Sequence, residues 1–157
     1  MIHGIQRRGN DEPATTEPGI IVGPTEVADV MTAKVVTLSP HHSISEAANL
    51  MNDRLLGHCV VVDTHGQLVG VISDRDILRA LARNPNSRTK SLDQIMTHNP
   101  VTVRRNTHIA DAVGKIISKR INCLPVVEED GSVCGIVTST DLLRSYQQLL
   151  DMMHKPR

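Results

Sequence analysis

The chain has 157 residues, and its 17 basic side chains are balanced by 17 acidic ones, so its formal net charge is zero. This balance argues against a nucleic-acid-binding protein that works through a strong basic field, and the absence of Phe and Trp argues against a base-stacking surface. Apolar residues still make up 39% of the chain, so a core has to be built from Val, Ile, Leu, Ala and Met.

The sequence shows no segment typical of a membrane or secreted protein. No run approaches the roughly 18 apolar residues that a membrane span needs, and the first ten residues contain no apolar signal-peptide region. The three cysteines, Cys59, Cys123 and Cys134, form no Cys-x-x-Cys pair and lie in apolar stretches, which is typical of reduced, buried thiols. We therefore expect a cytoplasmic protein; a redox-sensing role for a thiol stays open.

The N-terminal segment, residues 1–24, differs in composition from the rest. Its stretch over 11–19 has no hydrophobic periodicity and little to bury, which predicts a disordered tail. The alternative is a peptide that binds a partner.

From residue 27 onwards the sequence repeats itself after a shift of 65 positions. Val30-Met31-Thr32 falls on Ile95-Met96-Thr97, and Asp76 falls on Asp141. Thirteen of 55 aligned pairs are identical without a gap, so the chain is a duplication of one unit.

The first unit, residues 25–83, has the pattern β-α-β-β-α. Ser43 and Glu46 have the spacing of a capping box, and apolar residues recur at helical intervals after them. Two β-prone runs joined by a turn that ends in Gly66 predict a hairpin. The predicted elements in chain order are a turn at 26–31, an extended piece at 35–38, a helix at 43–55, strands at 59–62 and 68–72, and a helix at 74–83.

A polar linker, residues 84–91, leads to the second unit, residues 92–153, which repeats this order. Its strands are predicted at 123–127 and 133–137, and its last helix begins near Ser139. A unit of this size with a three-stranded sheet is marginal alone. We therefore expect the two copies to pack as one α/β (α+β) domain with pseudo-twofold symmetry.

The junction between the second strand and the last helix carries the same pattern in both units. It reads Gly, two apolar residues, Ser73 or Thr138, two variable residues, then Asp76 or Asp141. Free N–H groups and the helix dipole favour an anion at a helix start, the hydroxyl can donate to a phosphate, and the Asp can accept from ribose hydroxyls. The Gly would let the backbone approach a flat base. The same spacing also fits a purely structural capping box.

The double unit resembles a tandem CBS-domain protein, a pair of repeats named for cystathionine β-synthase and also called a Bateman module. The resemblance runs from about Val27 to Tyr146 and rests on the Val-Met-Thr opening, the Leu-Pro-Val-Val strand at 124–127 and the two Gly-x-x-Ser/Thr-x-x-Asp junctions. It implies two β-α-β-β-α repeats packed as a CBS pair. It also implies adenosine ligands: AMP, ADP or ATP, with NAD or S-adenosylmethionine in some members.

The resemblance also implies where such ligands bind, position by position. The hydroxyl residue and the Asp of each junction would contact phosphate and ribose, so that each repeat supplies one site. Arg75 stands where the second repeat has Thr140, and we expect it to pair with a phosphate and to give the Ser73 site the more charged ligand. The alternative is a solvated Arg on the helix surface. The implied ligand-binding residues are Ser73, Arg75, Asp76, Val36, Thr37, His58, Thr138, Thr140, Asp141, Val101, Thr102, Cys123 and Pro125.

Catalysis and metal binding find no support in the sequence. Ser73 has no evident base, and the eight histidines are scattered without ligand spacing. Arg79 and Arg144, three residues after each Asp, fit a helix ion pair better than a phosphate contact. We expect no enzyme, no metal and no obligatory cofactor.

The last helix carries an apolar stripe that extends past the repeat, formed by Leu142, Leu143, Tyr146, Leu149, Leu150 and Met153. This stripe predicts a homodimer through the terminal helices, as is common in the family. The leading hypothesis is a stand-alone sensor that binds an adenine nucleotide and signals by a population shift to an unknown effector protein in trans. The alternatives are a ligand-free dimerisation scaffold and, more weakly, an enzyme that acts on a nucleotide.

Overall fold

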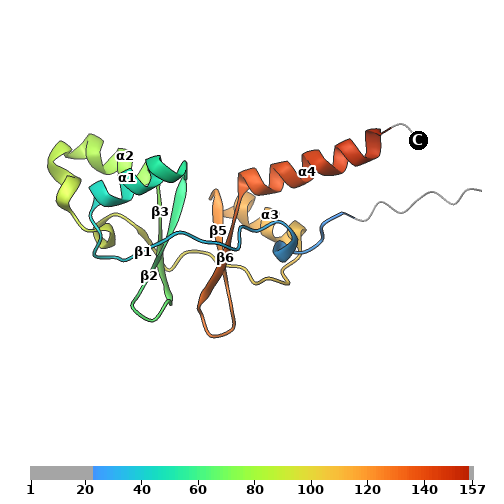
Figure 1. The fold of residues 1–157 in the computed structure, drawn as a ribbon, viewed down its shortest axis with the longest axis horizontal. Helices are drawn as coiled ribbons and strands as arrows, with labels where there is room; N and C mark the ends of the chain where they lie inside the picture. Colours follow the sequence, from blue (N-terminus) through green and yellow to red (C-terminus); the bar gives the residue numbers. More distant parts are fainter. Residues whose placement is uncertain (1–22, 156–157) are drawn as a thin grey trace, which may run out of the picture.

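The computed structural model describes residues 23–155, so nearly all of the predicted tail at 1–24 lies outside the described residues (Figure 1). The element order within each repeat is the predicted one. The helices are α1 (Ile44–Arg54), α2 (Asp74–Arg83), α3 (Ile109–Lys119) and α4 (Ser139–His154). The strands are β1 (Thr37–Leu38), β2 (His58–Val62), β3 (Leu68–Ser73), β4 (Thr97–His98), β5 (Cys123–Val127) and β6 (Val133–Thr138).

The two hairpins stand side by side, with α1 and α2 beside the first, α3 and α4 beside the second, and α4 running away from the pair (Figure 1). In β2–β3 the register runs from His58 opposite Ser73 to Val62 opposite Leu68. The β5–β6 hairpin keeps the same register, and both carry an irregularity near the hairpin turn. The predicted hairpins are thus confirmed.

The first helix begins where the capping pair predicts. The Ser43 hydroxyl accepts from the Glu46 N–H at 3.1 Å, and the Glu46 carboxylate accepts from the Ser43 N–H at 2.7 Å. The helix ends at Leu55, whose φ of 53° is the left-handed conformation, and Arg120 ends α3 in the same way.

The opening segments of the two repeats are exchanged. Thr97 in β4 pairs with Val71 in β3, and Thr32 bridges Ile136 in β6. The first sheet therefore has the order β1-β2-β3-β4, with β4 supplied by the second repeat, and the second sheet has only β5 and β6. The prediction of a separate three-stranded sheet in each unit was wrong, because hydrophobic patterns within one repeat do not show that its opening segment pairs with the other.

The hydrophobic core follows the same exchange. Leu92 and Met96 of the second repeat are buried in a cluster with Ile44 and Ile72 of the first. Val27, ahead of the first repeat's own strands, is fully buried in the cluster of the second. Neither repeat closes its own core, so the predicted boundaries at 25–83 and 92–153 mark repeats in the sequence rather than independent packing units.

Glycine at the two junctions makes the exchange possible. A Cβ on Gly70 would lie 2.6 Å from the Met96 sulfur and 2.9 Å from the Thr97 carbonyl oxygen. A Cβ on Gly135 would lie 2.6 Å from the sulfur of Met31. At both glycines the close approach is between the junction and the opening segment of the other repeat.

One proline explains why the second sheet has no counterpart of β1. Pro125 has no N–H to donate to a parallel neighbour, whereas Val60 at the equivalent position has one. The first repeat forms two parallel pairs between β1 and β2, including Thr37 with Val60. The second repeat keeps only the bridge between Val103 and Val126.

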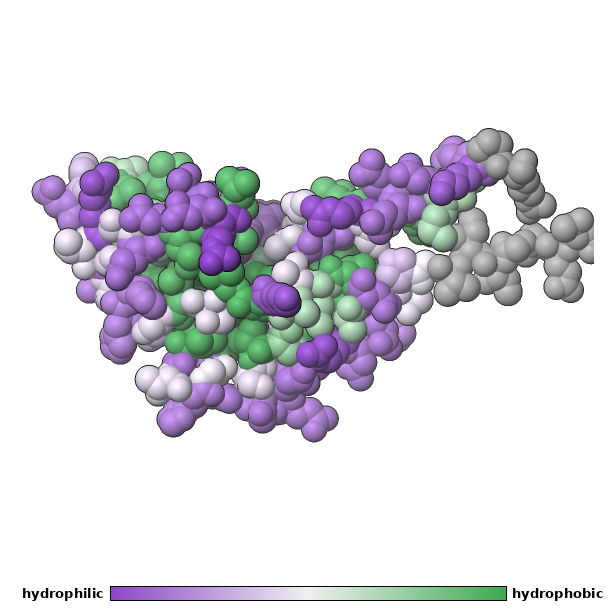
Figure 2. Space-filling view, in the orientation of Figure 1, coloured by the Kyte–Doolittle hydropathy of each residue, from purple (hydrophilic) through white to green (hydrophobic). Residues whose placement is uncertain are grey.

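The linker over residues 84–91 is more ordered than its polar composition predicts. A 3-10 helix spans Pro85–Thr89, capped by the Asn84 side chain. The Ser87 side chain is buried and its hydroxyl donates to the Asn84 carbonyl. Hydrophobic residues gather in the middle of the face shown in Figure 2, between the helices and the hairpin loops. None of the helices described has the length and apolar character that crossing a membrane requires.

Candidate functional site

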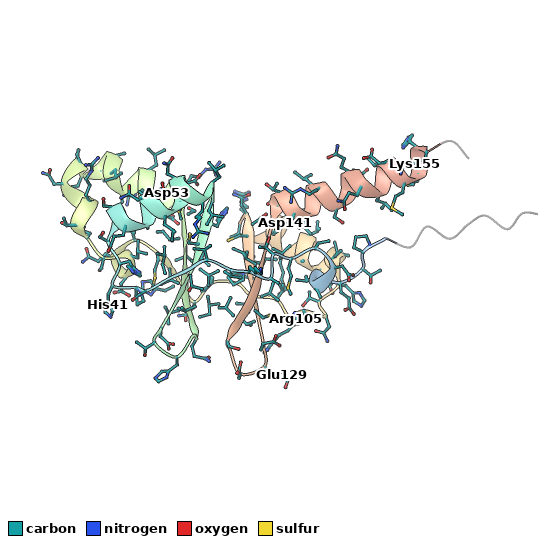
Figure 3. The ribbon with its side chains drawn as sticks, in the orientation of Figure 1. His41, Asp53, Arg105, Glu129, Asp141 and Lys155 are labelled. Atoms are coloured by element: carbon teal, nitrogen blue, oxygen red, sulfur yellow. The ribbon has the colours of Figure 1, made fainter. Side chains whose placement is uncertain are left out.

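A cleft of about 840 Å³ opens between the two repeats. Both strand-to-helix junctions line it, together with the opening loop of the first repeat and the residues that lead into β2. Asp141 lies at the N-terminal end of α4 (Figure 3). The lining residues are Thr32, Lys34, Val35, Val36, Leu55, Leu56, Gly57, His58, Ser73, Asp74, Arg75, Leu78, Asn122, Ile136, Thr138, Ser139, Thr140, Asp141 and Arg144.

Both junctions form capping boxes of nearly identical geometry. Asp76 accepts from the Ser73 N–H at 2.9 Å and from its hydroxyl at 2.8 Å, and the Asp76 N–H donates to the same hydroxyl at 3.1 Å. Asp141 accepts from the Thr138 N–H at 2.8 Å and from its hydroxyl at 2.9 Å. The structural capping role that the spacing allows is therefore present at both strand-to-helix junctions.

Each capping carboxylate also faces an arginine one turn later. Arg79 lies 3.5 Å from Asp76, and Arg144 lies 3.5 Å from Asp141. Both arginines are largely exposed, so solvent screens these pairs and they add little to stability. The predicted helix ion pairs are confirmed, and Arg144 additionally lines the cleft.

The two junctions differ in the residue directly after the cap. Asp74 follows Ser73, and its carboxylate accepts from the Arg75 N–H at 2.8 Å. Ser139 follows Thr138, and its hydroxyl instead donates to the Asn122 carbonyl at 3.3 Å. A carboxylate thus sits at the start of α2, while the start of α4 has none at that position.

His58 enters the cleft from the first residue of β2, opposite Ser73. Burial lowers the pKa of His58 because the charged imidazolium loses solvation. The negative charges of Asp74 and Asp76 partly offset this effect, and Arg75 reinforces it. The imidazole is therefore neutral at pH 7, able to donate from one ring nitrogen and accept at the other.

Cys123 stands at the position in β5 that matches His58 in β2, and it is buried. Burial raises the pKa of the Cys123 thiol to about 12, and that of Cys59 to about 11. These groups are protonated thiols at neutral pH and behave as small apolar side chains, as the sequence predicts.

The structure gathers about half of the implied ligand-binding residues in the cleft. Those that line it are Val36, His58, Ser73, Arg75, Thr138, Thr140 and Asp141. Those that do not are Thr37, Asp76, Val101, Thr102, Cys123 and Pro125. Asp76 instead lines a groove of about 330 Å³ between α2 and the linker.

Several cleft residues escaped the sequence analysis, above all Lys34, Asn122 and Asp74. Lys34 follows the Val-Met-Thr opening, and only the exchange of opening segments brings it to the second repeat's junction. Across residues 23–155, no group of three or more His, Cys, Asp or Glu side chains is arranged to hold a metal ion.

The comparison with protein families gives a match over most of the described chain. A family model described as "CBS domain" matches twice, at residues 27–83 and 92–148. Among curated proteins, a homoserine O-acetyltransferase of Methanohalobium evestigatum is 36% identical over 124 residues, which cover 79% of this chain and 24% of that protein. The chain spans about a quarter of the length of the curated relatives that it matches first.

Solved structures give the same result. The CBS domain pair of protein MJ0100 in complex with 5′-methylthioadenosine and S-adenosyl-L-methionine is 35% identical, with a TM-score of 0.74 over 79% of this chain and 97% of that one. The structure of CBSX2 in complex with AMP is 28% identical, with a TM-score of 0.73 over 81% of this chain and 99% of that one.

Proposed function

The chain belongs to the CBS domain family as a pair of repeats, and on that premise we propose that it is a regulatory module that binds an adenosine-containing ligand between the repeats. The observation that carries the proposal is the cleft of about 840 Å³ with both Ser/Thr-x-x-Asp junctions on its wall. Two of the similar CBS structures contain adenosine compounds, which supports the same ligand class here.

The cleft suits a ligand with a flat base and a polar tail. Val35, Val36 and Leu56 supply an apolar part, and the α4 start supplies hydroxyls and N–H groups. The Ser73 and Thr138 hydroxyls both donate to carboxylates that also accept from the N–H group of the same residue, so both side chains are held as helix caps. The apolar part and the polar α4 start support a binding site.

A binding titration tests the proposal. We expect calorimetry on the full chain to detect at least one of adenosine, AMP, ATP, 5′-methylthioadenosine and S-adenosylmethionine. Asp141→Ala removes both a capping group and a cleft residue and should abolish binding. Asp76→Ala is the matched control, because it breaks the equivalent cap without touching the cleft wall. Absence of binding by the whole panel contradicts the proposal.

A dimerisation scaffold without ligand is the second candidate, because both junction aspartates are already engaged by their caps and arginines. The exposed apolar residues of α4, Leu143, Tyr146, Met152 and Met153, support self-association in either case. We propose a homodimer that includes this helix. In sedimentation, Tyr146→Lys should give a monomer, whereas Gln147→Lys, which adds the same charge at an exposed neighbour, should not. Equal behaviour of the two variants contradicts a dimer through this face.

Ligand binding would then bias the arrangement of α2 and α4, whose first turns both face the cleft. The protein that receives the signal is a separate partner or a further part of a longer chain. Similar repeats make up about a quarter of longer proteins, such as the acetyltransferase relative. The buried, protonated thiols fit a reducing compartment such as the cytoplasm.

A further inference from the structure

The two repeats contribute different residues to the cleft, although they match in sequence pattern and fold. By the 65-residue shift, the counterparts of Lys34 and Val36 are Asn99 and Val101. The first pair lines the cleft and the second does not. Asp141 lines it and its counterpart Asp76 does not.

The opening loops explain this difference. His98 extends the pairing of β4 with β3, and its ring contacts the Asp93 carbonyl at 2.9 Å. Asn99 then turns with a φ of 46°, in the left-handed region that Asn tolerates. The first repeat makes a single bridge at Thr32 and shows no such turn at Lys34, so its loop runs along the cleft.

Charge is distributed unevenly over the cleft as well. Three cationic side chains line it, Lys34, Arg75 and Arg144, of which Arg144 faces the Asp141 carboxylate. Lys34 and Arg75 make no ion pair with any residue of the described chain. They come from different repeats, and one is replaced by Asn and the other by Thr at the equivalent positions.

The first turns of α2 and α4 also differ in the backbone N–H groups that they leave free. At the start of α2, the Asp74 carboxylate already accepts from the Arg75 N–H. At the start of α4, Ser139 leaves the Thr140 N–H without a side-chain partner among residues 23–155. The Ser139 and Asp141 N–H groups are already bonded, to the Asn122 carbonyl and the Thr138 hydroxyl. An anion is therefore favoured at α4, where the Thr140 N–H and two cations without ion pairs border the same cleft, and disfavoured at α2.

Resting on the proposed function, we infer that the chain binds one ligand rather than two, that this ligand carries a phosphate chain, and that the phosphates lie at the start of α4 between Lys34 and Arg75. This differs from the expectation that Arg75 serves the Ser73 site. Arg75 lines one cleft together with Ser73, Thr138 and Asp141, and we assign it to the phosphates at the second junction. An uncharged adenosine compound would use the apolar part of the cleft and form no ion pair with either cation.

The test compares adenosine, AMP, ADP and ATP by titration calorimetry in a buffer without divalent cations. We expect one ligand per chain and an affinity that rises with each phosphate. Lys34→Asn and Arg75→Thr each install the residue of the other repeat, and each should lower the ATP affinity about three- to tenfold while leaving that of adenosine within twofold.

A second pair of variants keeps the result interpretable. Ser139→Asp gives α4 the carboxylate that α2 has, and should lower the ATP affinity at least tenfold. Asp74→Ser makes the reciprocal change and should not weaken ATP binding. Two ligands per chain, equal affinity for adenosine and ATP, or swaps without effect overturn the inference but leave the proposed function intact. If none of the four compounds binds but 5′-methylthioadenosine or S-adenosylmethionine does, the inference fails and the proposed function stands. If no compound of either panel binds, both fail.

Discussion

The first and second repeats share their framework and differ where they face the cleft. Hairpin register, capping boxes and the glycines under the exchanged segments match after the 65-residue shift. The differences at the cleft lie at Lys34 against Asn99, Arg75 against Thr140 and Asp74 against Ser139. The contacts that hold the two repeats together therefore require the same residues in both copies, whereas the residues that line the cleft are needed in only one copy. A symmetric fold can in this way carry an asymmetric site.

We expect the largest effect on stability at the position where the first sheet has Val60 and the second has Pro125. Val60→Pro removes an N–H from the parallel ladder and volume from the core, and should lower the free energy of unfolding by about 2–4 kcal/mol. Pro125→Val should be neutral or slightly stabilising, because it adds an N–H where only one bridge forms. Urea unfolding followed by circular dichroism measures both, since the chain has no Trp. Equal losses from the two swaps would contradict this explanation.

The glycine contacts predict the next largest effect. Gly70→Ala should cost about 2–3 kcal/mol, because the new Cβ meets a backbone oxygen at 2.9 Å beside the buried Met96. Gly135→Ala should cost about 1–2 kcal/mol, because its nearest backbone oxygen is 3.2 Å away and the sulfur of half-buried Met31 can move.

Gly114→Ala is the matched control for these substitutions. It lies in α3, and nothing lies within 4 Å of the position that the new methyl group would take, so alanine should stabilise the helix by about 0.5–1 kcal/mol. If Gly70→Ala behaves like this control, the exchanged segments are not packed as closely as described.

Much of the fold could be predicted from the sequence, because local signals report local structure. The Ser43–Glu46 pair fixes the start of α1, and the run at 123–127 coincides with β5. The exchange of opening segments could not be predicted in this way. Thr32 and Ile136 are far apart in the chain, and both repeats carry the same hydrophobic pattern, so pairing within and between repeats look alike in the sequence.

The site was only half predictable for a related reason. Ser73, Thr138 and Asp141 belong to a motif and were found, whereas Lys34 carries no motif and depends on the exchange. The assignment by position also gave Asp76 a site of its own with Ser73, and it placed the backbone around Val101 beside a ligand base. It had no means of including the Asn99 turn, which is a property of the backbone.

The capping boxes predict equal effects on stability and unequal effects on binding. Ser73→Ala and Thr138→Ala should each lower the free energy of unfolding by about 1 kcal/mol, because each removes an N-cap acceptor. Only Thr138→Ala should also weaken ATP binding, measured by calorimetry. Thr138→Ser restores the cap and the donor and should recover both. Equal weakening by the two alanine variants would mean that the ligand uses both junctions.

The smallest predicted effect concerns His58, which faces Asp74, Asp76 and Arg75. Its pKa in the folded chain lies below the ordinary value of about 6.5 because burial disfavours the imidazolium. The unfolded chain therefore binds a proton that the folded chain resists, so this contribution to stability is complete above pH 6.5 and is lost as the pH falls from there toward the folded pKa. The effect is small because the two aspartates offset part of the burial.

His58→Cys gives the first repeat the residue of the second and should flatten the stability profile just below pH 6.5, measured by urea unfolding with a reductant present. His65→Gln, at an exposed position in the β2–β3 turn, is the control and should leave the profile unchanged. A profile that keeps its slope without His58 would assign the proton uptake to another histidine.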